Sequence, residues 1–254
     1  MPQAEAITAS QAVERALAIL ELFDEQRPEW TASEAAAALG VHRTTASRLL
    51  AALARHRLVE QRGGGRYVLG LGLVSLAGQV LGRLPLRDAG REIVRELRDR
   101  TGENAYLGIL DGDEVIFIEQ ASSPYVRHRA DWVGRRQPLA AGPTGAVLLA
   151  HQAPDVIAEL LREGRDEGYA AARLLTEPEL TRVRAHGHLA HYDDPLDDHA
   201  FVAAAVRDHT GEVVAAVCLG AARHRVGERR FWDDLVPAVL RASARVTEAL
   251  GAAP

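Results

Sequence analysis

The sequence is poor in sulfur and aromatic residues and contains no lysine. Its 254 residues include one cysteine, Cys218, and 5% aromatic residues. A single cysteine excludes intramolecular disulfides and cysteine-based zinc clusters. No apolar run approaches the ~20 residues needed to span a bilayer. The first ten residues have neither the basic start nor the apolar run of a secretory signal. We therefore expect a cytoplasmic protein without a membrane partner.

Sequence motifs of enzymes are also missing. We find no nucleophile elbow, no phosphate-binding glycine loop and no zinc-protease motif, so we expect no catalytic site and no cofactor. All 30 basic residues are arginine, and the net charge of -5 excludes a general polyanion binder. The hydrophobic content of 47% supports substantial cores, and the length predicts two domains.

The segment from Thr31 to Gly70 carries the clearest local pattern. Thr31-Ala32-Ser33-Glu34 matches a capping box, in which the threonine hydroxyl and the glutamate carboxylate each accept a backbone N–H of the other residue. An alanine-rich helix follows and ends at Gly40, as glycine favours. A second helix is predicted to begin near His42 or Arg43.

The second helix is predicted to be amphipathic, with one buried stripe at the i, i+3, i+4, i+7 spacing. That stripe consists of Ala46, Leu49, Leu50 and Leu53. The opposite arc carries arginine and hydroxyl side chains, which suit the edges of bases and the phosphates of DNA. Helix-turn-helix proteins read the major groove with the first turns of such a helix.

A glycine-tipped hairpin follows this helix. Leu58–Glu60 and Tyr67–Leu69 alternate like strands, and Gly63–Gly65 joins them. Six arginines and one acid lie between Val41 and Tyr67, which gives a local charge of +5 on an acidic chain. The pattern predicts a winged helix-turn-helix, and the alternative is a solvated helical pair in some other protein. The expected DNA contacts are Arg43, Thr44, Thr45, Ser47, Arg48, Arg55, Arg62 and Arg66.

Flanking helices complete the predicted organisation. Residues 11–24 form a first helix that closes the DNA-binding core, so this domain spans 11–70. Residues 71–83 form a linker helix that ends before Pro85, and residues 84–254 form the second domain. The side chains expected to point inward from the first helix are Val13, Ala16, Leu17, Leu20 and Phe23.

The second domain is predicted to hold an antiparallel sheet with flanking helices, so the whole chain is α+β. Strands are expected at 104–110 and 114–120, at 126–133, and at 201–207 and 213–219. Helices are expected at 86–100, 143–151, 154–163, 178–186 and 228–250. The last helix should bury one face, made of Trp232, Leu235, Val236, Val239 and Val246. Such sheets commonly enclose a small-molecule pocket.

Two further features allow alternative interpretations. His186, His188 and His191 lie close to Asp193 and Asp194, and imidazoles with carboxylates suit a divalent metal. The histidines at i and i+2 would point to different faces of a helix, so a polar loop is the alternative. Cys218 lies in an apolar strand without a second cysteine, which favours a core side chain over a redox sensor.

The chain resembles the IclR family of bacterial transcriptional regulators, from about Gln11 to about Leu250. The matching segments are ERALAILELF, RTTASRLLAALARHRLVEQRGGGRYVLGLGL, VGRRQPLAAGPTGAVLLA and FVAAAVRDHTGEVVAAVCLGAA. The resemblance implies a winged-helix domain, a linker helix and a GAF-like effector domain. It also implies homodimers, or dimers of dimers, that bind palindromic operators in double-stranded DNA and respond to a small-molecule effector.

The resemblance also implies the walls of an effector pocket. The matching positions are Gly142, Pro143, Thr144, Gly145, Asp193 or Asp194, Phe201, Cys218 and Gly220. The family commonly has His-Ala-(Ser/Thr) before Gly-Lys, whereas this chain has Ala140-Ala141-Gly142-Pro143-Thr144-Gly145-Ala146. Pro143 removes an N–H where a helix N-terminus would hold an anion. We therefore expect a larger and less acidic effector than glyoxylate or pyruvate, or a pocket that no longer binds one.

Together these features predict a transcriptional repressor whose operator affinity is set by a metabolite. Effector binding would shift the two wings of a dimer through the linker helix. One alternative is a metal-responsive repressor that uses His186, His188 and His191. The other is an enzyme with a DNA-docking module, which the absence of any paired nucleophile and base disfavours.

Overall fold

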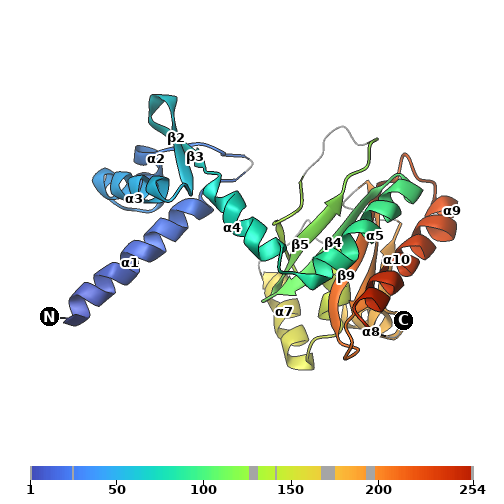
Figure 1. Cartoon of the computed structure of the whole chain (residues 1–254). Helices are drawn as coiled ribbons and strands as arrows, with labels where there is room; N and C mark the ends of the chain where they lie inside the picture. The colour runs from blue at the N-terminus through green and yellow to red at the C-terminus, as the bar shows by residue number, and fades with distance from the viewer. Residues whose placement is uncertain are drawn as a thin grey trace. The chain divides into compact units, whose positions relative to one another are not determined.

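The computed structural model describes residues 2–24, 26–125, 131–140, 142–166, 175–192 and 198–252, without the side chains of 2–9 and 163–166. The chain divides into two compact units, Met1–Arg83 and Leu84–Pro254 (Figure 1). Each unit has its own hydrophobic core. In the described part of the chain, no helix is long and apolar enough to cross a membrane.

The N-terminal unit is a winged helix-turn-helix, which confirms the prediction. Its helices are α1 (Pro2–Glu21), α2 (Ala32–Ala38), α3 (Arg43–Arg55) and α4 (Gly72–Leu81). Its antiparallel sheet has the order β1-β3-β2, with β1 at Trp30–Thr31, β2 at Val59–Arg62 and β3 at Arg66–Leu69. The two-residue β1 was not predicted, because its only partner is β3, which is far away in the sequence.

The predicted capping box begins α2. The backbone N–H of Glu34 donates to Thr31 Oγ1 at 3.3 Å, and the backbone N–H of Thr31 donates to Glu34 Oε2 at 2.8 Å. The Thr31 hydroxyl also donates to Glu34 Oε2, at 2.6 Å. The two hydrogen bonds that the carboxylate accepts from Thr31, first from the hydroxyl and then from the backbone N–H, lower the pKa of Glu34 from its usual 4.5 to about 2, and the nearby Arg27 contributes less. The carboxylate therefore stays charged at the helix N-terminus, where negative charge is favourable.

The buried side of α1 differs from the predicted one. Ile19 is fully buried, whereas Val13 and Leu17 are 60% and 53% exposed. The helix meets the rest of the unit through Ala16, Ile19 and Leu20, and Phe23, just after the helix, packs on the same core. Val13 and Leu17 lie on the neighbouring stripe, so the prediction that they point inward was wrong.

A close backbone approach joins the end of α3 to the start of α4. Arg57 follows the C-cap of α3 with φ of 59°, a conformation that costs free energy for a residue with a side chain. The N–H of Gly72 donates to the Arg57 carbonyl at 2.9 Å. A Cβ at Gly72 would lie 2.6 Å from the same oxygen, so only glycine fits there.

The C-terminal unit contains a six-stranded antiparallel sheet in the order β6-β5-β4-β9-β8-β7. The strands are β4 (Asn104–Asp111), β5 (Glu114–Ala121), β6 (Arg136–Pro138), β7 (His188–His191), β8 (His199–Arg207) and β9 (Val213–Ala222). The helices are α5 (Pro85–Thr101), α6 (Gly142–Leu149), α7 (Pro154–Asp166), α8 (Glu177–His186), α9 (Glu228–Arg230) and α10 (Val236–Ala249). Both predicted hairpins, β4–β5 and β8–β9, are confirmed.

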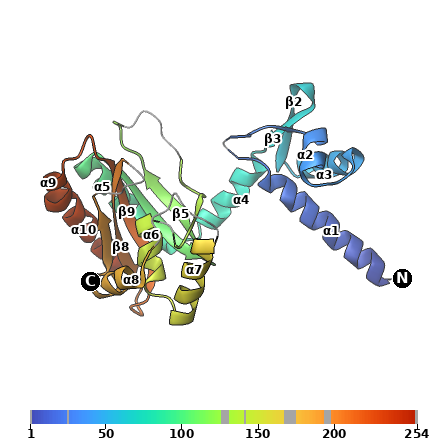
Figure 2. The ribbon, with the colours of Figure 1, turned by 180° about the vertical axis from the view of Figure 1, so that it is seen from behind.

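Helices cover both faces of this sheet. On one face lie α5 and α10 (Figure 1), and Gly90 of α5 sits so close to Leu107 that a Cβ would meet its side chain at 2.6 Å. On the other face lies α6, with α7 and α8 outside it (Figure 2). A core of α6, α7, α8 and sheet side chains, including Leu148, Ile157 and Cys218, fills that side.

Two strand predictions need correction. Of the strand expected at 126–133, residues 126–130 lie outside the described residues, and Asp131–Val133 are not in a strand. The third strand of this sheet along the chain is β6, which follows a left-handed residue, Gly134 (φ 84°), and pairs with β5. The histidine segment is not a loop: His188–His191 forms the edge strand β7. The sequence pattern did not predict β7 because its side chains are polar, and an edge strand need not be apolar on both faces.

The closing helix is interrupted. Phe231–Leu235 forms a π-helical turn between α9 and α10. Pro237 cannot donate the N–H that would continue an α-helix, which accounts for the wider turn before it. The turn shifts the helix face by one position, so Phe231 is buried while Trp232 is 43% exposed. The prediction that Trp232 lies on the buried face was therefore wrong.

We predict that Thr31→Ala lowers the stability of the N-terminal unit by about 1 kcal/mol at pH 7, because it removes an N-cap hydroxyl. Urea unfolding followed by circular dichroism measures the effect. The matched control is Thr181→Ala, which removes an exposed hydroxyl that bonds back to Glu177 O inside α8. An equal loss for both variants would contradict the prediction.

Low pH should weaken the hydrogen bonds between Thr31 and the Glu34 carboxylate. Because the folded-state pKa of Glu34 is lowered, its contribution is complete above the unfolded value of 4.5 and disappears as the pH falls through about 2. The difference between the parent and Thr31→Ala should therefore shrink between pH 4.5 and pH 2.

Candidate nucleic-acid interface and effector pocket

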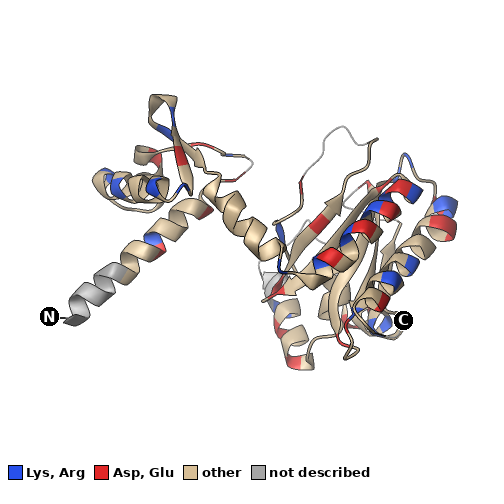
Figure 3. Cartoon of the chain, viewed as in Figure 1, with Lys and Arg blue, Asp and Glu red and all other residues tan. Residues whose placement is uncertain are grey.

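Helix α3 separates an exposed polar side from a buried apolar side. Ala46, Leu50 and Leu53 are buried in the core of the N-terminal unit, as predicted, and Leu49 is half-buried. Most of the predicted DNA contacts on this helix lie on the outside: Arg43, Thr44, Arg48 and Arg55 are exposed, and Thr45 and Ser47 are half-buried. The helix carries basic residues and no acidic ones (Figure 3). Such a surface complements the negative charge of a DNA groove.

The first turn of α3 is capped by His42, a residue absent from the predicted contacts. Its Nδ1 accepts the backbone N–H of Thr44 at 3.3 Å and lies 2.9 Å from Thr44 Oγ1. The first turn contains no acidic residue, so the positive end of the helix dipole is not neutralised. Sequence reasoning missed the cap because Ser, Thr, Asp and Asn are the usual residues there.

The hairpin between β2 and β3 forms the predicted wing. Gly64 and Gly65 adopt φ of 73° and 72°, which only glycine adopts readily. Arg62 Nε lies 3.1 Å from Glu60 Oε1, and Arg66 Nε lies 3.7 Å from Glu29 Oε2. All four side chains are largely exposed, so these ion pairs are weak and another anion can displace the glutamates.

Three of the predicted effector residues share one face of the C-terminal sheet, and a fourth lies on the helix that covers this face. Phe201 of β8 pairs directly with Gly220 of β9, and a Cβ at Gly220 would lie 3.0 Å from the Phe201 ring. Cys218 follows on the same face and shares a side-chain hydrogen bond with Thr144 of α6. The structure therefore brings Thr144, Phe201, Cys218 and Gly220 onto the face of the sheet that α6 covers.

The start of α6 is held close to the preceding strand. Gly142 has φ of 72° and lies against the Gln137 side chain, and Gly145 lies against the Leu139 carbonyl. Pro143 is half-buried at the start of the helix. The positive φ favours glycine at 142, and the close backbone approach requires it at 145, whether or not a ligand binds. Asp193 and Asp194 lie outside the described residues.

An aromatic cluster that the sequence did not reveal lies on the same face. Tyr106, Phe117 and Trp132 pack edge to face, with ring centroids 5.3 to 6.3 Å apart. Tyr106 pairs with Cys218 across β4 and β9, and burial raises its pKa well above the usual value. Strand register brings these residues together, and no local motif in the sequence encodes that register.

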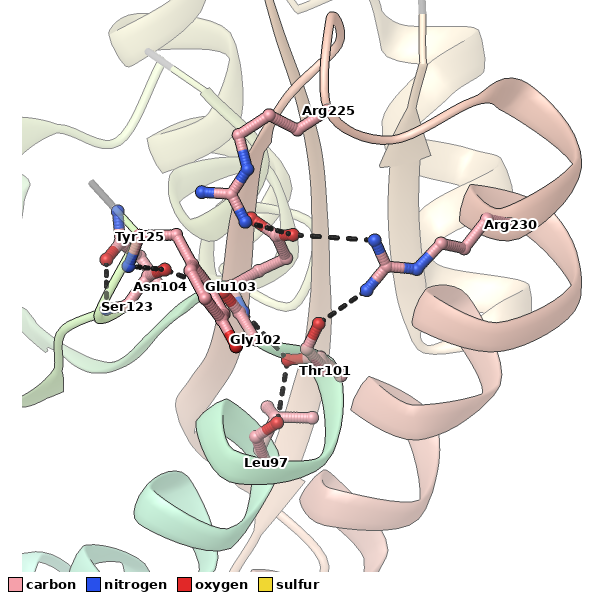
Figure 4. Close-up of polar contacts among 9 residues, drawn as sticks. All are labelled: Leu97, Thr101, Gly102, Glu103, Asn104, Ser123, Tyr125, Arg225 and Arg230. Carbon is pink, nitrogen blue, oxygen red and sulfur yellow. Dashed lines mark hydrogen bonds and ion pairs between the residues drawn. The ribbon is translucent and has the colours of Figure 1, made fainter.

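A buried carboxylate lies near the end of α5 (Figure 4). Glu103 is 1% exposed, and its Oε1 lies 3.2 Å from Arg225 Nη2 and 3.7 Å from Arg230 Nη1. Arg230 also donates to the Thr101 carbonyl at 2.6 Å. Burial raises the pKa of Glu103, and the two guanidinium groups oppose that rise. The cluster joins the end of α5 to the segment before α10.

The structure does not support the proposed histidine metal site. Among the described residues, no group of three or more His, Cys, Asp or Glu side chains is placed to hold a metal ion. His186 and His188 lie with ring centroids 6.3 Å apart, whereas His191 lies 3.9 Å from the Glu179 carboxylate. Positions 188 and 191 of a strand point to opposite faces, which separates the histidines.

We predict that the thiol of Cys218 is inert in the folded protein. Burial raises its pKa to about 11, so little thiolate exists at pH 8, and the side chain is also shielded from reagent. Ellman's reagent at pH 8 should modify the native chain roughly a hundredfold more slowly than the urea-unfolded chain, the matched control. Equal rates would show that the thiol is accessible.

Comparison with known proteins identifies related sequences and folds. Two family profiles match: "Bacterial transcriptional regulator IclR C-terminal" over residues 78–248 and "IclR helix-turn-helix domain" over residues 12–63. The HTH-type transcriptional regulator XynR of Escherichia coli (strain K12) is 31% identical over 223 residues, covering 86% of this chain and 88% of that protein.

Solved structures show the same fold. An IclR transcriptional regulator from Alicyclobacillus acidocaldarius matches with a TM-score of 0.80 at 24% identity, over 95% of this chain and 99% of that one. An IclR homolog complexed with 4-hydroxybenzoate from Microbacterium hydrocarbonoxydans matches with a TM-score of 0.76 at 23% identity, over 94% and 99% of the two chains.

Proposed function

The chain belongs to the IclR family of bacterial transcriptional regulators, and we propose that it is a cytoplasmic repressor without enzymatic activity. A palindromic operator in double-stranded DNA is its partner, and a small molecule bound in the C-terminal unit controls its affinity. The observation that carries the proposal is the exposed arginine and hydroxyl surface of α3 above a buried apolar stripe.

On the DNA, α3 enters the major groove with its first two turns. Arg43 and Arg48 have the fork of donors that suits guanine, and the hydroxyl groups of Thr44, Thr45 and Ser47 bond bases or phosphates. Arg55, Arg62 and Arg66 hold the backbone, with the wing arginines exchanging a weak carboxylate partner for phosphate. In a dimer, two such helices contact successive grooves about 34 Å apart.

Exposed apolar side chains in the N-terminal unit support the dimer. Helix α4 contains no charged residue (Figure 3) and buries none of its side chains within the unit. A groove of about 500 Å³ runs between the end of α3 and α4, lined in part by Leu58, Leu71 and Leu76. Monomers rarely leave such a surface open to water. The exposed large apolar residues of this unit are Val13, Leu17, Leu69, Leu71, Val74, Leu76 and Val80.

The effector is proposed to bind on the face of the sheet that α6 covers. Tyr106, Phe117 and Trp132 offer aromatic edges and faces there, and Thr144 offers a hydroxyl. Pro143 lacks the N–H that would help to hold a small carboxylate. We therefore assign an aromatic ligand, larger than glyoxylate or pyruvate, to this site, with the walls predicted from Gly142 to Gly145 and at Phe201, Cys218 and Gly220.

Control of DNA binding requires that the ligand favour one arrangement of the dimer over another. Helix α4 connects the N-terminal unit to α5 along the chain, and α5 packs on β4 and β5. A ligand beside Tyr106 of β4 and Phe117 of β5 would act on the strands against which α5 rests. Its differential affinity for two placements of α5 would set operator affinity.

We predict that Arg48→Ala weakens operator binding by about 1–3 kcal/mol, because one bidentate base contact is lost. The operator is first identified by pull-down of genomic DNA and sequencing, and affinity is then measured by gel shift. Arg229→Ala, which removes an almost fully exposed arginine from the C-terminal unit, is the matched control. Unchanged affinity of Arg48→Ala would remove this residue from the interface.

We predict that Val74→Glu disrupts the dimer, because it places a charge on an uncharged apolar helix that a partner covers. Sedimentation velocity should show monomer where the parent chain is dimeric, and operator affinity should fall with it. Val156→Glu on α7, another partly exposed valine, should leave the dimer intact. A dimeric Val74→Glu would place the contact elsewhere.

A further inference from the structure

The imidazole of His42 contacts the first turn of the recognition helix α3 on one side and faces solvent on the other. On the protein side, Nδ1 lies 3.3 Å from Thr44 N and 2.9 Å from Thr44 Oγ1. On the other side the ring is exposed, and no hydrogen bond described for this chain uses its Nε2.

This geometry selects one protonation form of the ring. To accept the Thr44 N–H, Nδ1 must carry a lone pair, so in the neutral imidazole the proton resides on Nε2. The outward nitrogen is therefore an N–H donor. Thr44 Oγ1 lies 2.9 Å from the same ring nitrogen, so the imidazole also lies against the Thr44 side chain.

The surroundings favour an anion in front of this donor. Arg43 follows directly, and α3 has no acidic residue in its first turn. The positive end of the helix dipole adds to the same field. Smaller cap residues would bond the Thr44 N–H equally well but lack a second, outward donor at the reach of an imidazole nitrogen.

We propose that His42 contacts DNA, with its Nε2–H donating to a backbone phosphate beside the groove that α3 enters. Through Nδ1 it also caps the first turn of α3 at Thr44. The inference rests on the proposed DNA-binding function and adds a residue to it.

Two variants separate capping from DNA contact. His42→Ser keeps a hydroxyl that accepts the Thr44 N–H but loses the outward imidazole donor, whereas His42→Ala loses both. Thermal unfolding should be unchanged in His42→Ser and lowered in His42→Ala. Binding to a random-sequence 30-base-pair duplex, followed by fluorescence anisotropy, should weaken roughly tenfold in His42→Ser, as expected for loss of a hydrogen bond to a charged group.

His209→Ser is the matched control, since His209 is an exposed histidine in the hairpin between β8 and β9. Its DNA binding should equal that of the parent chain. If His42→Ser also binds like the parent, the phosphate contact does not exist.

A spectroscopic measurement shows which nitrogen of the His42 ring carries the proton. In the full chain labelled with ¹⁵N-histidine, the His42 signals should show an unprotonated Nδ1 and a protonated Nε2 at pH 7.5, and the duplex should shift the Nε2–H signal. A proton on Nδ1, or an Nε2 signal that the duplex leaves unmoved, would overturn the inference.

The same measurements test the proposed function separately. If the parent chain binds no duplex at all, the DNA-reading assignment of α3 fails. If the parent binds, Arg48→Ala weakens binding and His42→Ser does not, only the assignment of His42 fails.

Discussion

Burial of the apolar stripe of α3 is the constraint on which the reading surface depends. Ala46 and Leu50 are fully buried against α1, α2 and the small sheet, so the helix cannot rotate without exposing them. That fixed rotation holds Arg43, Thr44 and Arg48 outward. Removing ~50 Å² of apolar surface from water is worth about 1.3 kcal/mol at 25 cal/mol per Å², so several such side chains together far outweigh any single surface contact of the arginines.

The contacts around this helix reinforce its placement from both ends. His42 caps its start, and at its end the strained Arg57 accepts the N–H of Gly72 as α4 begins. The end of the recognition helix and the start of α4 are thereby joined by backbone. The contact between α4 and the end of the recognition helix is therefore made by backbone groups and not by side chains alone.

The two sides of the sheet in the C-terminal unit are held by different kinds of contact. On the α5 side, Glu119 lies 3.1 Å from Arg87 and 3.2 Å from Arg91, and Glu103 binds Arg225 and Arg230. These half-buried ion pairs have specific geometry, so removing one side chain of a pair would leave the charge of the other poorly solvated. On the α6 side, Tyr106, Phe117 and Trp132 pack edge to face, and Cys218 shares a hydrogen bond with Thr144.

The sequence alone determined the local features: the capping box at Thr31, the amphipathic α3, the glycine wing and the two long hairpins. Each depends on residues close in the sequence, where hydrogen-bond chemistry and periodicity act directly. Only the tertiary structure decided which stripe of α1 is buried, that His188–His191 pairs as an edge strand, and that Tyr106, Phe117 and Cys218 share one face. Those outcomes depend on strand register and helix rotation, which are set by contacts between residues far apart in the chain.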